Sequence, residues 1–200
     1  MTPMRMTTDE ISNLCKELLW YKRPRQEHFA AEMGLELKIL LRCKLPTTSK
    51  SFRLISPHEL AHLIELNVQH ILETASCMSA SMRHWRKGFD VLDASGEFVS
   101  HHTFHPQALQ MADSVHGSVR SVGRDPIPTL TPEQLLRHRW RKAIYARDDW
   151  DLDDLSEATG YCQHSLVRLG YEHPKFGLTP TPEAVEVIEG LVALQQRIAA

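Results

Sequence analysis

One stretch near the front of the chain constrains the fold most, because it fits two short helices joined by a tight turn. Residues 25–45 read RQEHFAAEMGLELKILLRCKL. Phe29 and Ala30 fall inside the first predicted helix, and Leu40 falls inside the second. Gly34 lies at the turn, where glycine adopts positive φ without a steric cost, and the small Ala30 lets two helices approach closely. The spacing therefore predicts a helix-turn-helix.

A second stretch has the same spacing. Residues 151–171 read DLDDLSEATGYCQHSLVRLGY, with Leu155 before a turn at Gly160 and Leu166 after it. Helix-start signals precede both stretches. Thr7 is followed by Glu10, and Thr131 is followed by Pro132 and Gln134, which is the pattern of an N-terminal capping box. We therefore expect a further helix in front of each helix-turn-helix.

The two halves align as an internal repeat. Placing Gly34 on Gly160 also places Leu40 on Leu166 and Arg42 on Arg168. Two extra residues in the first loop then bring further identities into register. These pairs are Phe52 with Phe176, Leu54 with Leu178, Glu59 with Glu183, Ile64 with Ile188, and Glu65 with Glu189.

Each half has the order helix, helix-turn-helix, short extended wing, helix, and this order resembles the winged helix-turn-helix superfamily. The phrase FGLTPTPEAVEVIEGL, residues 176–191, is similar to the last wing strand and closing helix of such proteins. Pro182 is a departure, because a glycine usually follows that strand. The resemblance is to a broad superfamily, and it implies two tandem winged units that bind DNA.

The middle of the chain predicts a connector. Phe89, Val91 and Leu92 precede a turn at 94–96, and a helix is expected from about Pro106, ended by Gly117. The fold is therefore expected to be mainly α with small β-hairpins. Its parts would be winged-helix-like units at 1–74 and 129–200 and a hairpin-plus-helix connector at 75–128.

The second helix-turn-helix supplies the side chains expected to contact double-stranded DNA. Its second helix carries polar side chains away from its apolar face, of types that reach base edges or phosphates: Gln163, His164, Ser165 and Arg168. Lys175 at the wing tip, and Lys38, Arg42 and Lys50 in the first unit, are expected to hold phosphates. The sequence thus predicts a sequence-specific transcriptional regulator, with a homodimer interface in the first unit or the connector.

The charge distribution keeps an alternative open. The formal net charge is −2, so DNA affinity would rest on local basic patches such as YKRPR at 21–25, RHWRK at 83–87 and RHRWRK at 137–142. The acidic run DDWDLDD, residues 148–154, would repel DNA that it faced. It favours a protein-binding module instead, an anti-activator or an inhibitor of a nucleic-acid complex.

A second alternative comes from the order H-E-x-x-H. His58 and His62 would lie one helical turn apart as zinc ligands, and Glu59 would be the general base of a zinc peptidase. A structural explanation competes with it, since Ser56 and Glu59 also form a capping box. The run SHHTFH at 100–105 could add a ligand, but adjacent strand residues point to opposite faces. With DNA binding as the main hypothesis, no cofactor is expected.

Cysteine spacing and hydropathy indicate the compartment. The four cysteines lie far apart with no C-x-x-C pair, which favours free thiols in a reducing cytoplasm. No run of apolar residues is long enough for a membrane span, and the first ten residues lack the apolar core of a signal peptide. We therefore expect a cytoplasmic protein without a membrane partner.

Overall fold

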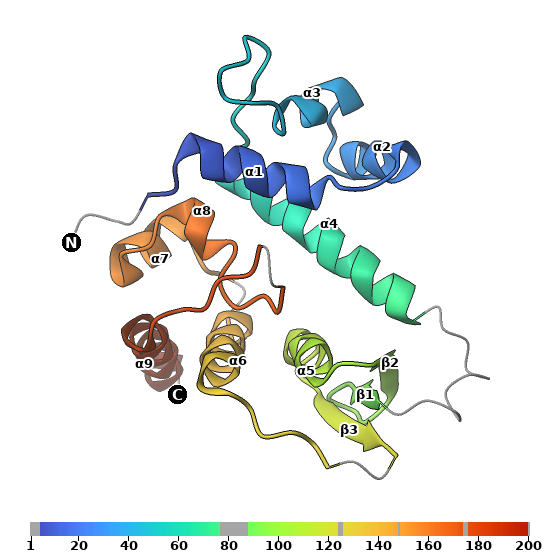
Figure 1. The fold of residues 1–200 in the computed structure, drawn as a ribbon. Coiled ribbons are helices and arrows are strands. Elements are labelled where there is room, and N and C mark those ends of the chain that lie inside the picture. The colour runs from blue at the N-terminus through green and yellow to red at the C-terminus, as the bar shows by residue number, and fades with distance from the viewer. Residues whose placement is uncertain (1–4, 77–87, 124–125, 148, 174–175, 200) are drawn as a thin grey trace. The chain divides into compact units, whose positions relative to one another are not determined.

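The chain is mainly helical with one small antiparallel sheet (Figure 1), which confirms the predicted fold class. The structure, a computed structural model, describes residues 5–76, 88–123, 126–147, 149–173 and 176–199. They gather into two compact units that alternate along the chain, whereas the sequence suggested consecutive segments. Unit 1 holds residues 1–69, 152–168 and 173–177, and unit 2 holds 70–151, 169–172 and 178–200.

Unit 1 is helical in all its described elements. These are α1 (Thr8–Leu18), α2 (Arg23–Glu32), α3 (Leu37–Arg42), the first part of α4 (Pro57–Ser76), α7 (Leu152–Thr159) and α8 (Gln163–Leu166). Its core takes apolar side chains from each of the first four helices. Its fully buried members include Leu18, Phe29, Leu40, Leu60, Leu63 and Ile64.

Side-chain caps fix where the long helices begin. The Thr7 amide donates to Glu10 at 2.7 Å, and the Glu10 amide donates back to the Thr7 hydroxyl at 3.3 Å, so the predicted capping box is confirmed. Ser56 and Glu59 make the same reciprocal pair at the start of α4, at 2.9 and 3.2 Å. Each box satisfies amides that the first turn of a helix leaves without partners.

Both predicted helix-turn-helix turns are confirmed. Gly34 has φ +64° and Gly160 has φ +73°, a region that residues with a Cβ rarely adopt. The Leu35 amide closes the first turn on the Ala30 carbonyl at 2.8 Å, and the Gly160 amide closes the second on the Ser156 carbonyl at 2.9 Å. The helices after the turns are short, with six residues in α3 and four in α8.

The two predicted wings differ from the structure. In the described residues between α3 and α4, the chain forms turns and no strand. In the second wing, Leu169 and Leu178 form an isolated parallel bridge instead of the antiparallel pair that a hairpin requires. Lys175, assigned to the tip of that wing, lies outside the described residues.

Unit 2 combines a small sheet with three helices. The strands β1 (Gly88–Leu92), β2 (Phe98–His102) and β3 (Ser118–Val122) are antiparallel in the order β2-β1-β3. The helices are α5 (His105–Ser114), α6 (Pro132–Tyr145) and α9 (Pro182–Ala199). Val91 of β1 packs against Ala108 and Ala112 of α5, and α6 packs against both α5 and α9.

The β1–β2 hairpin was predicted, but β3 was missed. Ser118–Val122 has the sequence SVRSV and is at most half-buried. Its apolar and polar residues therefore alternate too weakly to predict a strand. Its strand conformation comes from pairing with β1, in which Asp90 lies opposite Arg120 and Val91 opposite Val119. A short edge strand of this kind is decided by its partner more than by its own residues.

We expect the turn glycines to resist substitution for conformational reasons alone. Gly34→Ala and Gly160→Ala should each lower the free energy of unfolding by about 1–2 kcal/mol, because a Cβ is unfavourable at positive φ. No neighbouring atom would meet the added Cβ at either position. Gly190→Ala is the matched control, since it lies in α9 with open space around it and should gain about 0.5–1 kcal/mol. Urea denaturation measures the unfolding free energy of all three variants. Equal changes at the three positions would contradict the explanation by positive φ.

Candidate nucleic-acid interface

The polar side chains predicted to read DNA from α8 are engaged within unit 1. The Gln163 amide donates to the Asp153 carboxylate of α7. Ser165 is buried, with its hydroxyl 3.3 Å from the Cys162 sulfur. His164 donates from Nε2 to the Ile55 carbonyl at 3.1 Å. A helix of four residues with these contacts is poorly suited to lie in a major groove.

Arg168 follows the same pattern. Its Nε donates to the Phe176 carbonyl at 2.9 Å, and its Nη1 lies 3.5 Å from the Met6 sulfur. Burial lowers the pKa of the Arg168 guanidinium, although the nearby Glu10 carboxylate opposes the shift. Arg168 therefore holds the Phe176 backbone in place, and reaching a base edge would require breaking that contact.

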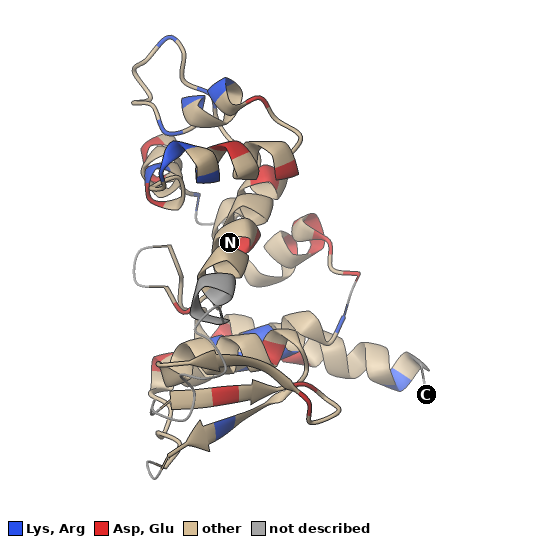
Figure 2. Cartoon of the chain, turned by 90° about the vertical axis from the view of Figure 1, so that its right-hand side faces the viewer, with Lys and Arg blue, Asp and Glu red and all other residues tan. Residues whose placement is uncertain are grey.

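The first helix-turn-helix presents its basic side chains to solvent. Lys38 and Arg42 are exposed and lie four residues apart, on one side of α3, while Leu40 is fully buried. Lys50 is exposed in the loop that follows. The ribbon coloured by charge shows several basic segments in this part of the chain (Figure 2). Of the predicted phosphate contacts, these three are available for binding.

The H-E-x-x-H residues lie at the first turns of α4 with Glu59 already engaged. The Glu59 carboxylate accepts from the Ser56 amide and forms an ion pair with Arg53 at 2.5 Å. Although partial burial opposes it, these hydrogen bonds lower the Glu59 pKa. His58 is exposed and His62 is half-buried. Across the described ranges, no three His, Cys, Asp or Glu side chains gather as a metal site would require.

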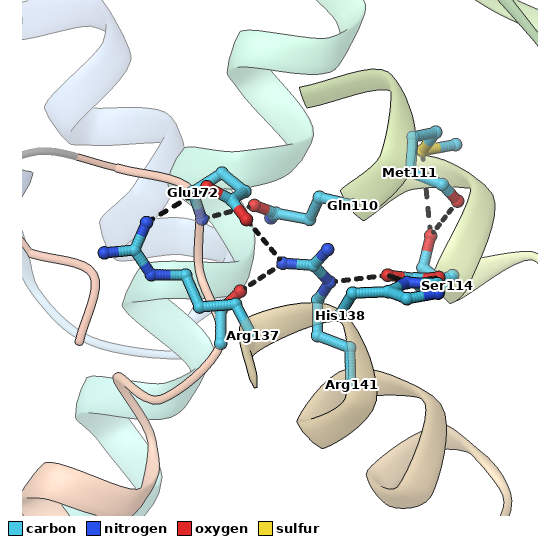
Figure 3. A network of polar contacts seen from close by, with 9 residues as sticks. Gln110, Met111, Ser114, Arg137, His138, Arg141 and Glu172 are labelled. Carbon is cyan, nitrogen blue, oxygen red and sulfur yellow. Dashed lines mark hydrogen bonds and ion pairs between the residues drawn. The ribbon is translucent and has the colours of Figure 1, made fainter. Parts of the chain in front are cut away.

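A buried polar network in unit 2 was not predicted from the sequence (Figure 3). Arg141 of α6 is 3% exposed. Its Nε donates to Asp113 of α5 at 2.7 Å, and its Nη1 donates to the Gly170 carbonyl at 2.5 Å and to Glu172 at 3.1 Å. Arg137, one turn earlier on α6, bonds the second Glu172 oxygen at 3.1 Å. Both carboxylates are thus shared between basic groups.

This network corrects the interpretation of RHRWRK as a basic surface patch. Arg141 faces inward because Asp113 and Glu172, 28 and 31 residues away, come to it through the fold. His138 adds a contact of 2.9 Å to Asp113, and the Glu172 amide donates to Gln110 at 2.7 Å. The spacing of four between Arg137 and Arg141 was a signal that the two share a helix face, but it did not show which way they face.

The histidines of SHHTFH divide between the two sides of the sheet, as alternation predicts. His101 lies opposite Asp90 on the neighbouring strand, with Nδ1 2.8 Å from its carboxylate, and Arg120 donates to the same carboxylate at 3.1 Å. His102 is 2% exposed and lies 2.8 Å from the Ser100 hydroxyl. Burial, aided by nearby His101, lowers the His102 pKa to about 4.

Comparison with family models, curated proteins and solved structures gave no match to this chain. No helix in the described part of the chain combines the length and apolar character that crossing a bilayer requires.

Arg141 should be the most sensitive position of the polar network. Replacing it by alanine leaves two buried carboxylates short of partners, so Arg141→Ala should lower the free energy of unfolding by about 3–5 kcal/mol. Arg139 is the matched control on the same helix, since its pair with Glu189 is more than a third exposed on both sides. Arg139→Ala should cost at most about 1 kcal/mol. If urea denaturation gave the same loss of unfolding free energy for Arg141→Ala as for Arg139→Ala, the network would contribute little to stability.

His102 should make stability depend on pH below neutrality. The folded protein keeps His102 neutral down to about pH 4, whereas a histidine in the unfolded chain is protonated below about pH 6.5. Stability present above pH 6.5 should therefore fall as the pH drops toward 4, by roughly 3 kcal/mol at most. Urea denaturation at several pH values measures this dependence of the unfolding free energy on pH. His102→Gln should flatten this part of the profile, whereas exposed His58→Gln should not.

Proposed function

We propose that this protein is a transcriptional regulator that binds double-stranded DNA through α2, the Gly34 turn and α3. One observation carries the proposal. The short α3 docks in unit 1 by its buried Leu40, while Lys38 and Arg42 extend from its exposed side. A helix held by one face that presents two cations from the other has the arrangement with which a helix-turn-helix meets DNA.

The loop after α3 supports the same surface. The Arg53 amide donates to the Arg42 carbonyl at 3.4 Å, so the loop returns to the end of α3. Lys50 lies in that loop and is exposed. Lys38 pairs with Glu36 at 2.6 Å, but both side chains are largely exposed, and a pair of that kind is weak enough to exchange for a phosphate.

Specificity would come from the same side chains. Lysine and arginine both bond guanine O6 and N7 in the major groove, and arginine does so with two parallel hydrogen bonds. Arg42 is therefore the candidate for base contact, while Lys38 and Lys50 are candidates for phosphate contact. A homodimer acting in the cytoplasm would place two such surfaces on two half-sites.

The test is duplex binding by the α3 variants. Fluorescence anisotropy with selected duplex fragments should show weaker binding for Lys38→Ala and for Arg42→Ala. Lys38→Ala should reduce the salt dependence by about one released counterion, whereas Arg42→Ala should reduce the preference for the selected sequence. Arg197→Ala, an exposed arginine on α9, is the matched control and should change neither quantity. Equal affinities for all three variants and the unaltered protein would overturn the assignment of α3.

A protein partner is the second candidate, and the acidic run favours it. Asp149, Asp151, Asp153 and Asp154 are exposed at the start of and just before α7. Such a segment suits a basic protein surface better than DNA. If the protein retains no duplex fragment even at low salt, an anti-activator or an inhibitor of a nucleic-acid complex becomes the better proposal.

A further inference from the structure

Trp20, between α1 and α2, is the most exposed large apolar side chain among the described residues, at 84%. Its neighbours Leu18 and Leu19 are each 1% exposed, so the exposure is not the result of a loose helix end. The Trp20 amide donates to the Glu17 carbonyl at 3.3 Å. The buried Gln26 side chain donates to the Leu19 carbonyl at 2.9 Å. The backbone is thus fixed on both sides of an indole that extends into solvent.

The sequence around Trp20 is basic. Residues 16–28 contain Lys16, Lys22, Arg23 and Arg25 against two glutamates. Lys22 and Arg23 are exposed, and Lys22 lies within about 7 Å of Trp20 along the backbone. Arg23 is paired with Glu27 at 2.8 Å, but its side chain is 78% exposed, so the pair can give way to a stronger anion.

We propose that this corner, Trp20 with Lys22 and Arg23, binds single-stranded nucleic acid by stacking Trp20 on an unpaired base. Single strands are bound by this combination, in which cations follow the phosphates and an aromatic side chain accepts a base. A base in an intact duplex is not available to the indole. The site therefore goes beyond the proposed duplex contact of α3 and uses different residues.

An acidic protein would also be attracted to these cations, but it would not require a flat aromatic surface. Three probes therefore separate a nucleic-acid strand from an acidic protein. A labelled oligothymidine offers bases and phosphates, an abasic oligomer of the same length offers phosphates alone, and a polyglutamate peptide offers carboxylates. If stacking contributes, the protein should bind oligothymidine about tenfold or more tightly than the abasic oligomer.

The variants locate the effect. Trp20→Ala should remove the preference for oligothymidine and leave abasic binding unchanged, while Trp20→Phe should retain part of the preference. Lys22→Ala with Arg23→Ala should weaken binding of both oligomers. Phe104→Ala, which truncates an aromatic side chain 63% exposed in unit 2, is the matched control and should have no effect. The fluorescence of Trp20 is obtained by subtracting the emission of the Trp20→Phe variant from that of the unaltered protein, and oligothymidine should quench it.

Equal binding of oligothymidine and the abasic oligomer would overturn the proposal, as would polyglutamate binding of the same strength. The same protein samples are then measured with duplex DNA. If Trp20→Ala does not change oligothymidine binding but the α3 variants weaken duplex binding, only the single-strand site is rejected. If Trp20→Ala weakens oligothymidine binding but Lys38→Ala and Arg42→Ala leave duplex binding unchanged, only the proposed function is rejected.

Discussion

Unit 2 depends on the burial of one guanidinium. Arg141 is almost fully enclosed, and a charge in that position is tolerated only when its partners are enclosed with it. It joins Asp113 of α5 and the Gly170–Glu172 segment to α6. The close approach is also steric, because a Cβ at Gly170 would lie 3.0 Å from both Trp140 and Arg141. Charge and shape together fix where the chain passes α6.

The path of the chain explains why the two helix-turn-helix stretches differ. Residues 152–168 and 173–177 belong to unit 1, but the four residues between them belong to unit 2, where the Arg141 network holds them. The second stretch is therefore constrained at its end, and its polar side chains are engaged in local contacts. The loop after α3 is also anchored, since the Ser12 hydroxyl donates to the Leu45 carbonyl at 2.7 Å, but Lys38, Arg42 and Lys50 remain exposed.

The surface of unit 1 thus offers two kinds of basic feature. One is the exposed side of α3, and the other is the corner at Trp20. Both rest on a buried apolar core that fixes the backbone beneath them. Because the chain as a whole is slightly acidic, with a net charge of −2, binding of any polyanion must come from such local groups and should weaken as salt rises.

The sequence by itself determined the local structure. Capping pairs such as Thr7–Glu10, the turns at Gly34 and Gly160 and the β1–β2 hairpin follow from residues a few positions apart, so their signals lie within one window. The sequence named the cations of α3, which are exposed, but it did not show that the polar side chains of α8 make contacts within unit 1. Tertiary structure decided the pairing of β3 and the inward direction of Arg141 and Arg168. The partners of β3 and Arg141 lie far away in sequence, and the Arg168 partner is a loop carbonyl eight residues on. An arginine looks the same in sequence whether it meets solvent or a buried partner.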